Sequence, residues 1–422
     1  MAAGVVRHKG GSERFTPVTS LRGIGPGIVL AATGLGAGDL IAASVAGARF
    51  GYALLWAALL GAVLKFTLNE GLARWQLVTG TTLLEGWKRR LPRFVSWYFI
   101  LYLLLWTFVV AGALMAACGL AVHALFPTVD VKIAGGVQSL LAAALVLFGR
   151  YRWLEQTMKI FILLMFVLVL YCAWQLFPGW DILLAGMLVP RIPDGSLWFL
   201  LGVVGGVGGS VTLLSYGYWI AERGWKQPGN LGMVRLDLLI AYAMTALFAV
   251  AVMVVSAGVR PEVMQGADMV LSVADHLGLV VGEVGRWFFL VGFWAAVFSS
   301  MLGVWQGVPY LFCDFVRKAE AGAPPVCNTH GMRDPLYRVY LAGMSLLPMV
   351  LLSFGKPVWL VVVYAVVGAM FMPLLAALLL YMNNRSGWMR DYTNSLWSNA
   401  ALLLALGLFA TLLVNKLTSV LT

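Results

Sequence analysis

Long apolar stretches separated by short polar segments run along the 422-residue chain from about residue 26 to its end. A helix that crosses a bilayer needs roughly 20 predominantly apolar residues. The predicted spans are residues 26–49, 52–74, 95–122, 131–149, 157–177, 196–221, 236–257, 286–313, 336–354, 357–382 and 395–415. Because a helix satisfies its own backbone hydrogen bonds in lipid, the pattern predicts an all-α integral membrane protein with about eleven spans.

The composition supports this fold class. Apolar residues make up 61% of the chain and charged residues only 11%, whereas soluble domains carry about 25% charged residues. The first 25 residues are polar and basic and lack the apolar core of a signal peptide. They are therefore predicted to be a cytoplasmic tail.

Basic residues alternate between the two sides of the predicted membrane. With the N-terminus inside, 21 of the 29 Lys and Arg residues lie on the cytoplasmic side, seven lie outside, and Lys65 lies within a span. Cytoplasmic loops carry such an excess of positive charge. This predicts a multi-pass protein of the cell (inner) membrane with an external C-terminus. It also explains the net charge of +11 without a nucleic-acid partner, and no obligatory protein partner is evident.

Two spans contain glycine clusters, at residues 34–39 (GLGAGD) and 205–210 (GGVGGS). Each glycine costs about 1 kcal/mol against alanine within a helix. Such clusters occur at close helix–helix contacts or in unwound stretches. Because they lie at matching positions of two five-span halves, they favour an inverted-repeat transporter with two broken helices. The predicted organisation is a tail (1–25), a core (26–382) and an additional helix (395–415), with repeats over about 26–177 and 196–382.

Three of the ionisable residues within the predicted spans, Asp39, Lys65 and Glu70, concern the candidate site. Asp39 lies at the first break, where a carboxylate costs on the order of 3 kcal/mol and is a functional candidate by default. The alternative is a structural ion pair with Lys65 of the second span. Lys65 is expected to pair with Glu70 of the same span rather than to neutralise Asp39. A carboxylate beside open carbonyl groups suits a cation, since hard cations bind oxygen ligands.

Several short segments resemble the Nramp family of divalent-metal transporters. In the first half these are residues 47–52 (GARFGY), 54–56 (LLW), Arg74 with 78–80 (VTG), 149–151 (GRY) and 154–155 (LE). In the second half they are Asp237, Ser299, Ser300 and Gln306. The resemblance implies a LeuT-like 5+5 inverted repeat with a discontinuous first and sixth helix. It also implies a divalent metal cation as the transported substrate.

The departures from the family pattern affect the site itself. Gly36 stands where the family has aspartate, and Asp39 where it has asparagine. Gly209 replaces the metal-binding methionine, and Ser210 and Val211 replace the following proline and histidine. Ala111 and Leu114 stand at the acidic positions of the proton pathway. This pattern resembles the Nramp-related magnesium transporters, which lack the methionine, and implies passage of Mg²⁺ with Mn²⁺ tolerated.

The chemistry of the ligands agrees with this resemblance. A thioether favours later transition metals, and its replacement by glycine leaves room for Mg²⁺, which keeps several waters. The expected metal-site residues are Asp39, Thr33, Gly36, Gly206 and Gly209, of which Asp39 supplies a carboxylate and the others backbone oxygens. Gln306 and Tyr216 are expected to contact the water shell, and Lys65 and Glu70 to tune the charge.

The missing acidic pair and histidine predict transport without proton coupling. A divalent ion gains about 4.6 kcal/mol per 100 mV of membrane potential, twice the value for one charge, so no second ion is needed. No phosphate-binding loop or nucleophile motif is present in the sequence, which predicts a carrier that is not an enzyme and needs no cofactor. Two alternatives remain: the same fold carrying an amino acid or another small organic solute, and a non-transporting sensor.

Overall fold

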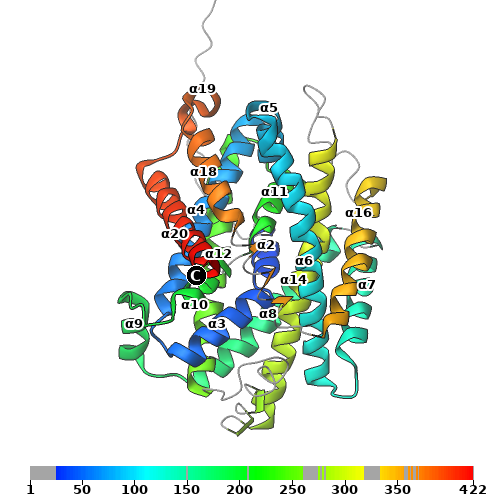
Figure 1. Ribbon diagram of the computed structural model, residues 1–422, viewed down its shortest axis with the longest axis vertical. Coiled ribbons are helices and arrows are strands. Elements are labelled where there is room, and N and C mark those ends of the chain that lie inside the picture. The colour runs from blue at the N-terminus through cyan, green and yellow to red at the C-terminus, as the bar shows by residue number, and fades with distance from the viewer. Residues whose placement is uncertain are drawn as a thin grey trace, which may run out of the picture.

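The computed structural model describes residues 25–421 apart from 149–150, 207–208, 260–273, 276–277, 280–281, 318–332, 356–359, 362, 365–366 and 369. The described parts are helices joined by short connections (Figure 1). Seven helical stretches in these parts are long and apolar enough to cross a membrane: Leu55–Thr79, Arg93–Leu125, Val131–Phe148, Glu155–Gln175, Pro228–Gly258, Glu283–Val316 and Pro335–Phe354. They coincide with seven of the eleven predicted spans.

These stretches correspond to five long helices and two helices that are each joined to a 3₁₀ segment. They are α4 (Leu55–Thr79), α6 (Arg93–Leu125), α7 (Val131–Phe148), α8 (Tyr151–Gln175), η2 (Pro228–Asn230) with α12 (Leu231–Val259), α14 (Glu283–Val316), and α16 (Pro335–Leu346) with η4 (Leu347–Phe354).

The other predicted spans are built from shorter pieces. The first is α2 (Pro26–Gly34) followed by α3 (Ala37–Phe50). The sixth is α10 (Leu197–Gly206), then η1 (Val211–Ser215) and α11 (Tyr216–Glu222). The tenth contains α18 (Phe371–Asn383) and lies partly outside the described residues, and the last coincides with α20 (Leu396–Leu421). The prediction of interrupted first and sixth helices therefore agrees with the structure.

Short helices connect the longer ones at the ends of the bundle. They are α5 (Leu83–Arg90), α9 (Trp180–Leu188), α19 (Ser386–Met389) and η5 (Arg390–Tyr392). The hydroxyl of Thr82 caps α5 by accepting the backbone N–H of Glu85 at 3.1 Å. Such a cap satisfies one of the unpaired N–H groups of a first helical turn.

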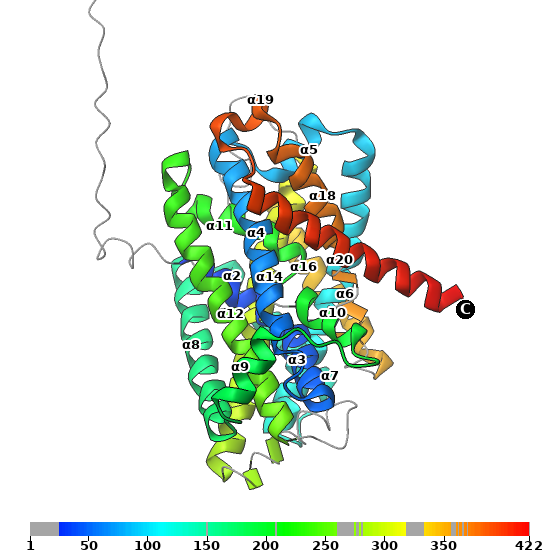
Figure 2. The same ribbon diagram turned by 90° about the vertical axis from the view of Figure 1, so that its left-hand side faces the viewer.

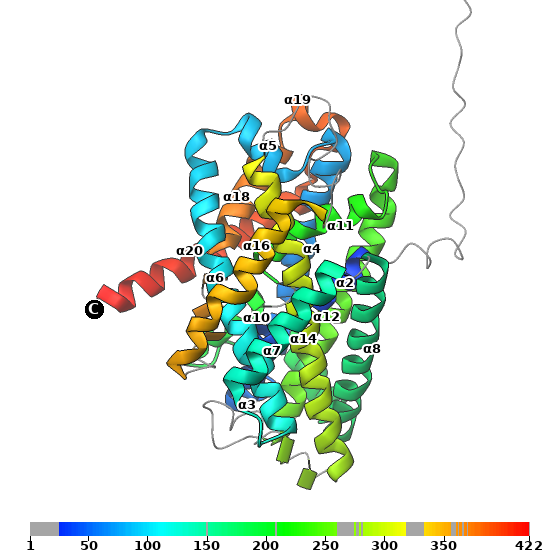
Figure 3. The ribbon, with the colours of Figure 1, turned by 90° about the vertical axis from the view of Figure 1, so that its right-hand side faces the viewer.

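Apolar side chains cover the outer face of the bundle. On α8, the exposed large side chains recur every three or four residues, the spacing of one helix face: Ile160, Leu163, Val167, Tyr171 and Trp174. An apolar outer surface this large is typical of a membrane protein. Figures 2 and 3 show that α20 leaves the bundle obliquely, with its last turns clear of the other helices.

Loops that the charge pattern assigns to the cytoplasm contact one another. The Arg90 guanidinium lies 4.7 Å from the centre of the Trp388 ring. The Lys88 ammonium donates to the carbonyl oxygen of Arg317 at 2.7 Å. Figure 1 shows α5 and α19 at one end of the molecule and α9 at the side of the opposite half. These contacts agree with the predicted alternation of the loops between the two sides of the membrane. The orientation of the two termini stays a prediction.

The two broken helices lie inside the bundle. Helix α2 packs against α8, α12 and α14, whereas α3 packs against α10 and α12. In Figure 1, α2 and α10 lie about half-way along the long axis. Both interruptions are therefore enclosed by other helices, which is where irregular backbone is tolerated at membrane depth.

Candidate functional site at the two helix breaks

The first helix is interrupted at Leu35 and Gly36, between Gly34 and Ala37. Leu35 has φ −80° and ψ 59°, and Gly36 is extended with φ −100° and ψ −170°. Neither residue continues the helix. The last carbonyl groups of α2 therefore have no partners within that helix, as at any helix end.

The sixth helix is interrupted after Gly206, the last residue of α10. Gly209 has φ +84°, a conformation that side chains with a Cβ atom rarely adopt. The chain then resumes as a 3₁₀ helix at Val211 and as an α-helix at Tyr216. The backbone conformation at position 209 thus requires glycine. The replacement of the family's methionine therefore affects the conformation as well as the ligand set.

The two interruptions lie against each other. A Cβ atom added to Gly209 would lie 3.6 Å from the Cα atom of Gly34. The 3₁₀ helix that follows the second break also contacts α2 and α14. The structure therefore brings together two backbone segments that are about 170 residues apart in the sequence, as expected for a site formed by paired broken helices.

Two serines of α14 satisfy the open end of α2. The Ser300 hydroxyl donates to the carbonyl oxygen of Thr33 at 2.7 Å. The Ser299 hydroxyl is shared between the carbonyl oxygen of Ala296 in its own helix at 2.9 Å and that of Ala32 at 3.3 Å. The Thr33 hydroxyl donates within its own helix, to Val29, at 2.7 Å. A carbonyl oxygen has two lone pairs, so Thr33 retains the capacity to bind a further group.

Small residues permit this close approach of α14. A Cβ atom on Gly36 would overlap the Ser300 hydroxyl, and one on Gly303 would overlap the Thr33 side chain. Glycines at helix contacts let backbones approach closely in membranes. The aspartate that the family has at position 36 would not fit here without movement of Ser300.

Lys65 of α4 reaches the second break. Its ammonium group donates to the carbonyl oxygen of Gly205 at 2.6 Å and also to that of Gly209. Lys65 as a whole is buried, with only 1% of its surface exposed. The expected pairing of Lys65 with Glu70 is wrong, because the two Glu70 carboxylate oxygens are bound by arginines.

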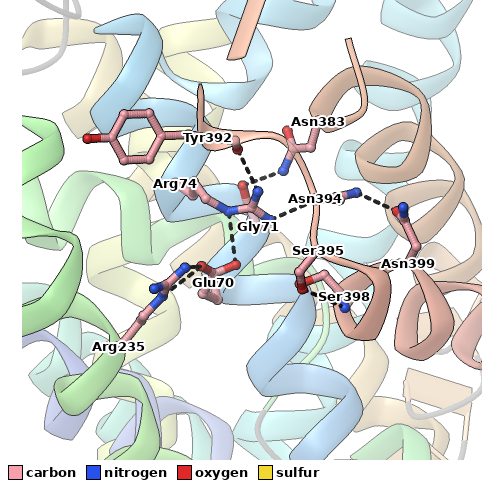
Figure 4. A network of polar contacts seen from close by, with 10 residues as sticks. All are labelled: Glu70, Gly71, Arg74, Arg235, Asn383, Tyr392, Asn394, Ser395, Ser398 and Asn399. Atoms are coloured by element: carbon pink, nitrogen blue, oxygen red, sulfur yellow. Dashed lines mark hydrogen bonds and ion pairs between the residues drawn. The ribbon is translucent and has the colours of Figure 1, made fainter. Parts of the chain in front are cut away.

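Those arginines are Arg74 and Arg235. Arg74 Nε lies 3.2 Å from Glu70 Oε2, and Arg235 Nη2 lies 2.8 Å from Glu70 Oε1 (Figure 4). Lys65 and Glu70 are five residues apart on α4, which is about 140° around a helix of 3.6 residues per turn. They therefore face different neighbours, and Glu70 is part of an ionic network with α12.

Asp39 is the third residue of α3, directly after the first break. Its side chain lies outside the described residues, so its role as a ligand stays a prediction. Among the described side chains, His, Cys, Asp and Glu form no group of three or more that could hold a metal ion. A metal at this position would therefore depend on backbone oxygens and water in addition to Asp39.

The two predicted water-shell residues occupy different places. The Tyr216 hydroxyl donates to Asp237 at 2.8 Å, and the same carboxylate accepts the backbone N–H of Gly27 at 2.6 Å. Tyr216 thus supports the start of α2, away from the break. The Gln306 side-chain oxygen accepts the indole N–H of Trp219, while its buried Nε2 has no hydrogen-bond partner among the described residues.

A third segment beside the second break was missed by sequence reasoning. A Cβ atom on Gly368 would lie 2.8 Å from the Ser210 hydroxyl and 3.6 Å from the indole nitrogen of Trp106. Both polar atoms are buried without a partner in the described part of the chain. The position of Trp106 could have indicated a polar environment here. Tryptophan prefers the membrane interfaces, and this one lies in the middle of a span.

The fold and the site together define the class of this protein: an all-helical, multi-pass membrane protein whose two interrupted helices meet inside the bundle. Solved structures with this fold include a manganese transporter of Eremococcus coleocola, with a TM-score of 0.75 and 17% identity over 98% of this chain and 89% of that one. MhsT in complex with L-phenylalanine gives a TM-score of 0.62 and 17% identity over 92% and 97%. The chain therefore has the LeuT-type fold.

The chain belongs to the Nramp family, described as natural resistance-associated macrophage protein-like, whose profile matches residues 27–419. The divalent metal cation transporter MntH of Yersinia pestis is 30% identical over 187 residues, which are 43% of this chain and 45% of that protein. MntH of Chromohalobacter salexigens is 25% identical over 304 residues, or 67% and 68%. The match thus spans less than half the length of the Yersinia protein. The family is a family of transporters, not enzymes.

Proposed function

We propose that this protein carries divalent metal cations across the membrane by alternating access, with Mg²⁺ as the main substrate and Mn²⁺ tolerated. The observation that carries the proposal is the meeting of the two interruptions at Gly34 and Gly209 inside an apolar bundle. Unwound backbone at such a place presents carbonyl oxygens and half-helix ends to a substrate. Membership of the Nramp family and the similarity to MntH proteins support a metal cation.

The proposed ligand set consists of oxygens. Asp39 supplies the negative charge, and the carbonyl groups of Thr33, Gly36, Gly206 and Gly209 bind the ion or its waters. Mg²⁺ dehydrates reluctantly and is usually held by one or two carboxylates. A glycine in place of a thioether removes the preference for softer transition metals. Both points favour Mg²⁺ over the later transition metals.

The membrane potential supplies the energy of accumulation in this proposal. A divalent ion gains about 4.6 kcal/mol when it crosses 100 mV towards the negative side, a gradient of about three orders of magnitude. Ala111 and Leu114 of α6 cannot exchange protons, and both are fully buried. Uptake that proceeds without acidification of the liposome interior, followed by an internal pH indicator, supports uncoupled transport, whereas acidification in proportion to uptake contradicts it.

Replacement of Asp39 tests the proposal directly. Asp39→Ala and Asp39→Asn are expected to reduce Mg²⁺ and Mn²⁺ uptake into liposomes by about tenfold or more, because each removes the charged ligand of a hydrated ion. An internal Mg²⁺- or Mn²⁺-sensitive dye gives the readout. The matched control is Asp194→Asn, which neutralises an exposed carboxylate before α10. Equal uptake by wild type and Asp39→Ala would contradict the proposal.

One observation favours a second candidate function, the transport of an amino acid or another small organic solute. The Lys65 ammonium at the break gives the site a positive group that could pair with a substrate carboxylate. A LeuT-type protein of similar fold, MhsT, was solved with L-phenylalanine. Thermal stabilisation of the purified protein by amino acids, with none by Mg²⁺ or Mn²⁺, would favour this function over cation transport.

A further inference from the structure

The second helix break contains a positively charged group of the protein itself, the ammonium group of Lys65. The ammonium group of Lys65 binds the carbonyl oxygens of Gly205 and Gly209. The last carbonyl groups of a helix have no partners within it and carry the partial negative charge of the helix dipole. An ammonium group has three donors and no acceptor, so it occupies these oxygens as a small metal cation would.

We propose that Lys65 is a tethered cation that occupies the oxygen site at the end of α10 and competes there with the transported ion. The proposal rests on the proposed function in one respect, since it takes the transported substrate to be a cation. Gly209 is one of the residues whose carbonyl group we assign to the substrate. A divalent ion that reaches this oxygen meets a positive charge already bound to it.

The burial of Lys65 explains why the charge matters. The residue is 1% exposed, and a buried ammonium is costly unless it is well bonded. Repulsion between two cations is far stronger in a protein interior than in water, because the effective dielectric constant is lower. Lys65 therefore weakens divalent binding while it stabilises the broken helix. These two effects have opposite signs.

The opposite effects of Lys65 on divalent binding and on stability give a test that distinguishes the proposal from a purely structural role. Lys65→Met keeps an unbranched side chain that is one atom shorter and removes the charge. We expect it to lower the melting temperature in detergent, since two carbonyl groups lose their donor, and to lower the KM for Mg²⁺ and Mn²⁺ uptake by about tenfold, since one repulsion is removed. An unchanged or increased KM would overturn the proposal.

Lys88 provides a matched control. Its ammonium group also binds backbone carbonyl oxygens, those of Asp314 and Arg317, each at 2.7 Å. These oxygens lie at the end of α14, away from the two breaks. Lys88→Met should lower the melting temperature and leave the KM for divalent ions unchanged. An equal reduction of KM in Lys88→Met would overturn the proposal, because the effect would not depend on the break.

A second measurement does not depend on the transported substrate. In Lys65→Ala, the truncated side chain leaves the oxygens of Gly205 and Gly209 without their ammonium. Methylammonium chloride should then raise the melting temperature of this variant by several degrees. Tetramethylammonium chloride at the same concentration should not, because it has no N–H donor. Wild type and Lys65→Met, in which the side chain still fills the space, should show no such difference.

The two measurements separate the two proposals. If none of the proteins carries Mg²⁺ or Mn²⁺, the proposed function is wrong, while the methylammonium result still decides whether Lys65 occupies a cation site. If Lys65→Ala shows no selective stabilisation by methylammonium, the assignment of Lys65 as a tethered cation is wrong, whatever the protein transports.

Discussion

At the residue scale, glycine decides the geometry of the site. Gly209 has a positive φ, Gly36 leaves room for Ser300, and Gly303 leaves room for Thr33. The first of these is a conformational requirement, and the other two are requirements of space. The glycines therefore both break the helices and let the broken ends approach one another.

Replacement of Gly209 tests the conformational requirement. Gly209→Ala is expected to destabilise the protein by about 1–2 kcal/mol, because a left-handed conformation costs a residue with a Cβ atom this amount. The new Cβ atom would also lie only 2.5 Å from the Thr212 hydroxyl oxygen. The melting temperature in detergent provides the measurement. Gly229→Ala is the control, since a Cβ atom there would meet no other atom within 4 Å, and a similar loss in both variants would refute the explanation.

At the scale of elements, α2 is a nine-residue helix held at both ends by other helices. The Asp237 carboxylate of α12 accepts the N–H groups of Gly25 and Gly27 at its start. The hydroxyls of Ser299 and Ser300 of α14 donate to its final carbonyl groups. A helix this short is marginal by itself, so its stability depends on these contacts and on packing.

Loss of the Ser300 hydroxyl should loosen the end of α2. Ser300→Ala is expected to cost about 1 kcal/mol, the typical net value of one hydrogen bond, and to speed amide hydrogen exchange in residues 31–36 more than elsewhere. Exchange measured by mass spectrometry in detergent tests this prediction. Ser353→Ala removes an exposed hydroxyl bonded within its own helix and should leave exchange at α2 unchanged. If residues 31–36 of Ser300→Ala exchange no faster relative to the rest of the protein than they do in wild type, the capping role is contradicted.

At the scale of the whole molecule, an ionic network ties three distant parts of the chain together (Figure 4). Glu70 of α4 binds Arg74 and, on α12, Arg235. Arg74 continues the network by donating to the carbonyl oxygen of Tyr392 and to the side chain of Asn394, each at 2.7 Å. The network thus joins α4 to α12 and to the segment that precedes α20.

Neutralisation of Glu70 tests the importance of this network. Glu70→Gln is expected to cost about 3 kcal/mol, because it leaves the buried Arg74 without its carboxylate, and the melting temperature should fall accordingly. Asp275→Asn is the control: it breaks the exposed pair with Arg286, and such pairs contribute less than about 1 kcal/mol. Equal losses in the two variants would show that the burial of the network is unimportant.

The sequence by itself determined the membrane fold and the places where two helices break. Apolar stretches of sufficient length have few alternatives in lipid, because helices satisfy their backbone groups internally. The glycine clusters at 34–39 and 205–210 marked the breaks because glycine is the weakest helix former apart from proline. These are local properties, and they can be identified without knowledge of the neighbouring helices.

Only the tertiary structure decided which groups meet at the breaks. Lys65 pairs with the carbonyl groups of Gly205 and Gly209 at the second break and not with Glu70 of its own helix. Tyr216 reaches the start of α2, and Gly368 brings a third segment to Ser210. Such contacts depend on the rotation and depth of each helix, and many rotations of an apolar helix bury similar surface. Packing against the neighbouring helices selects one of them.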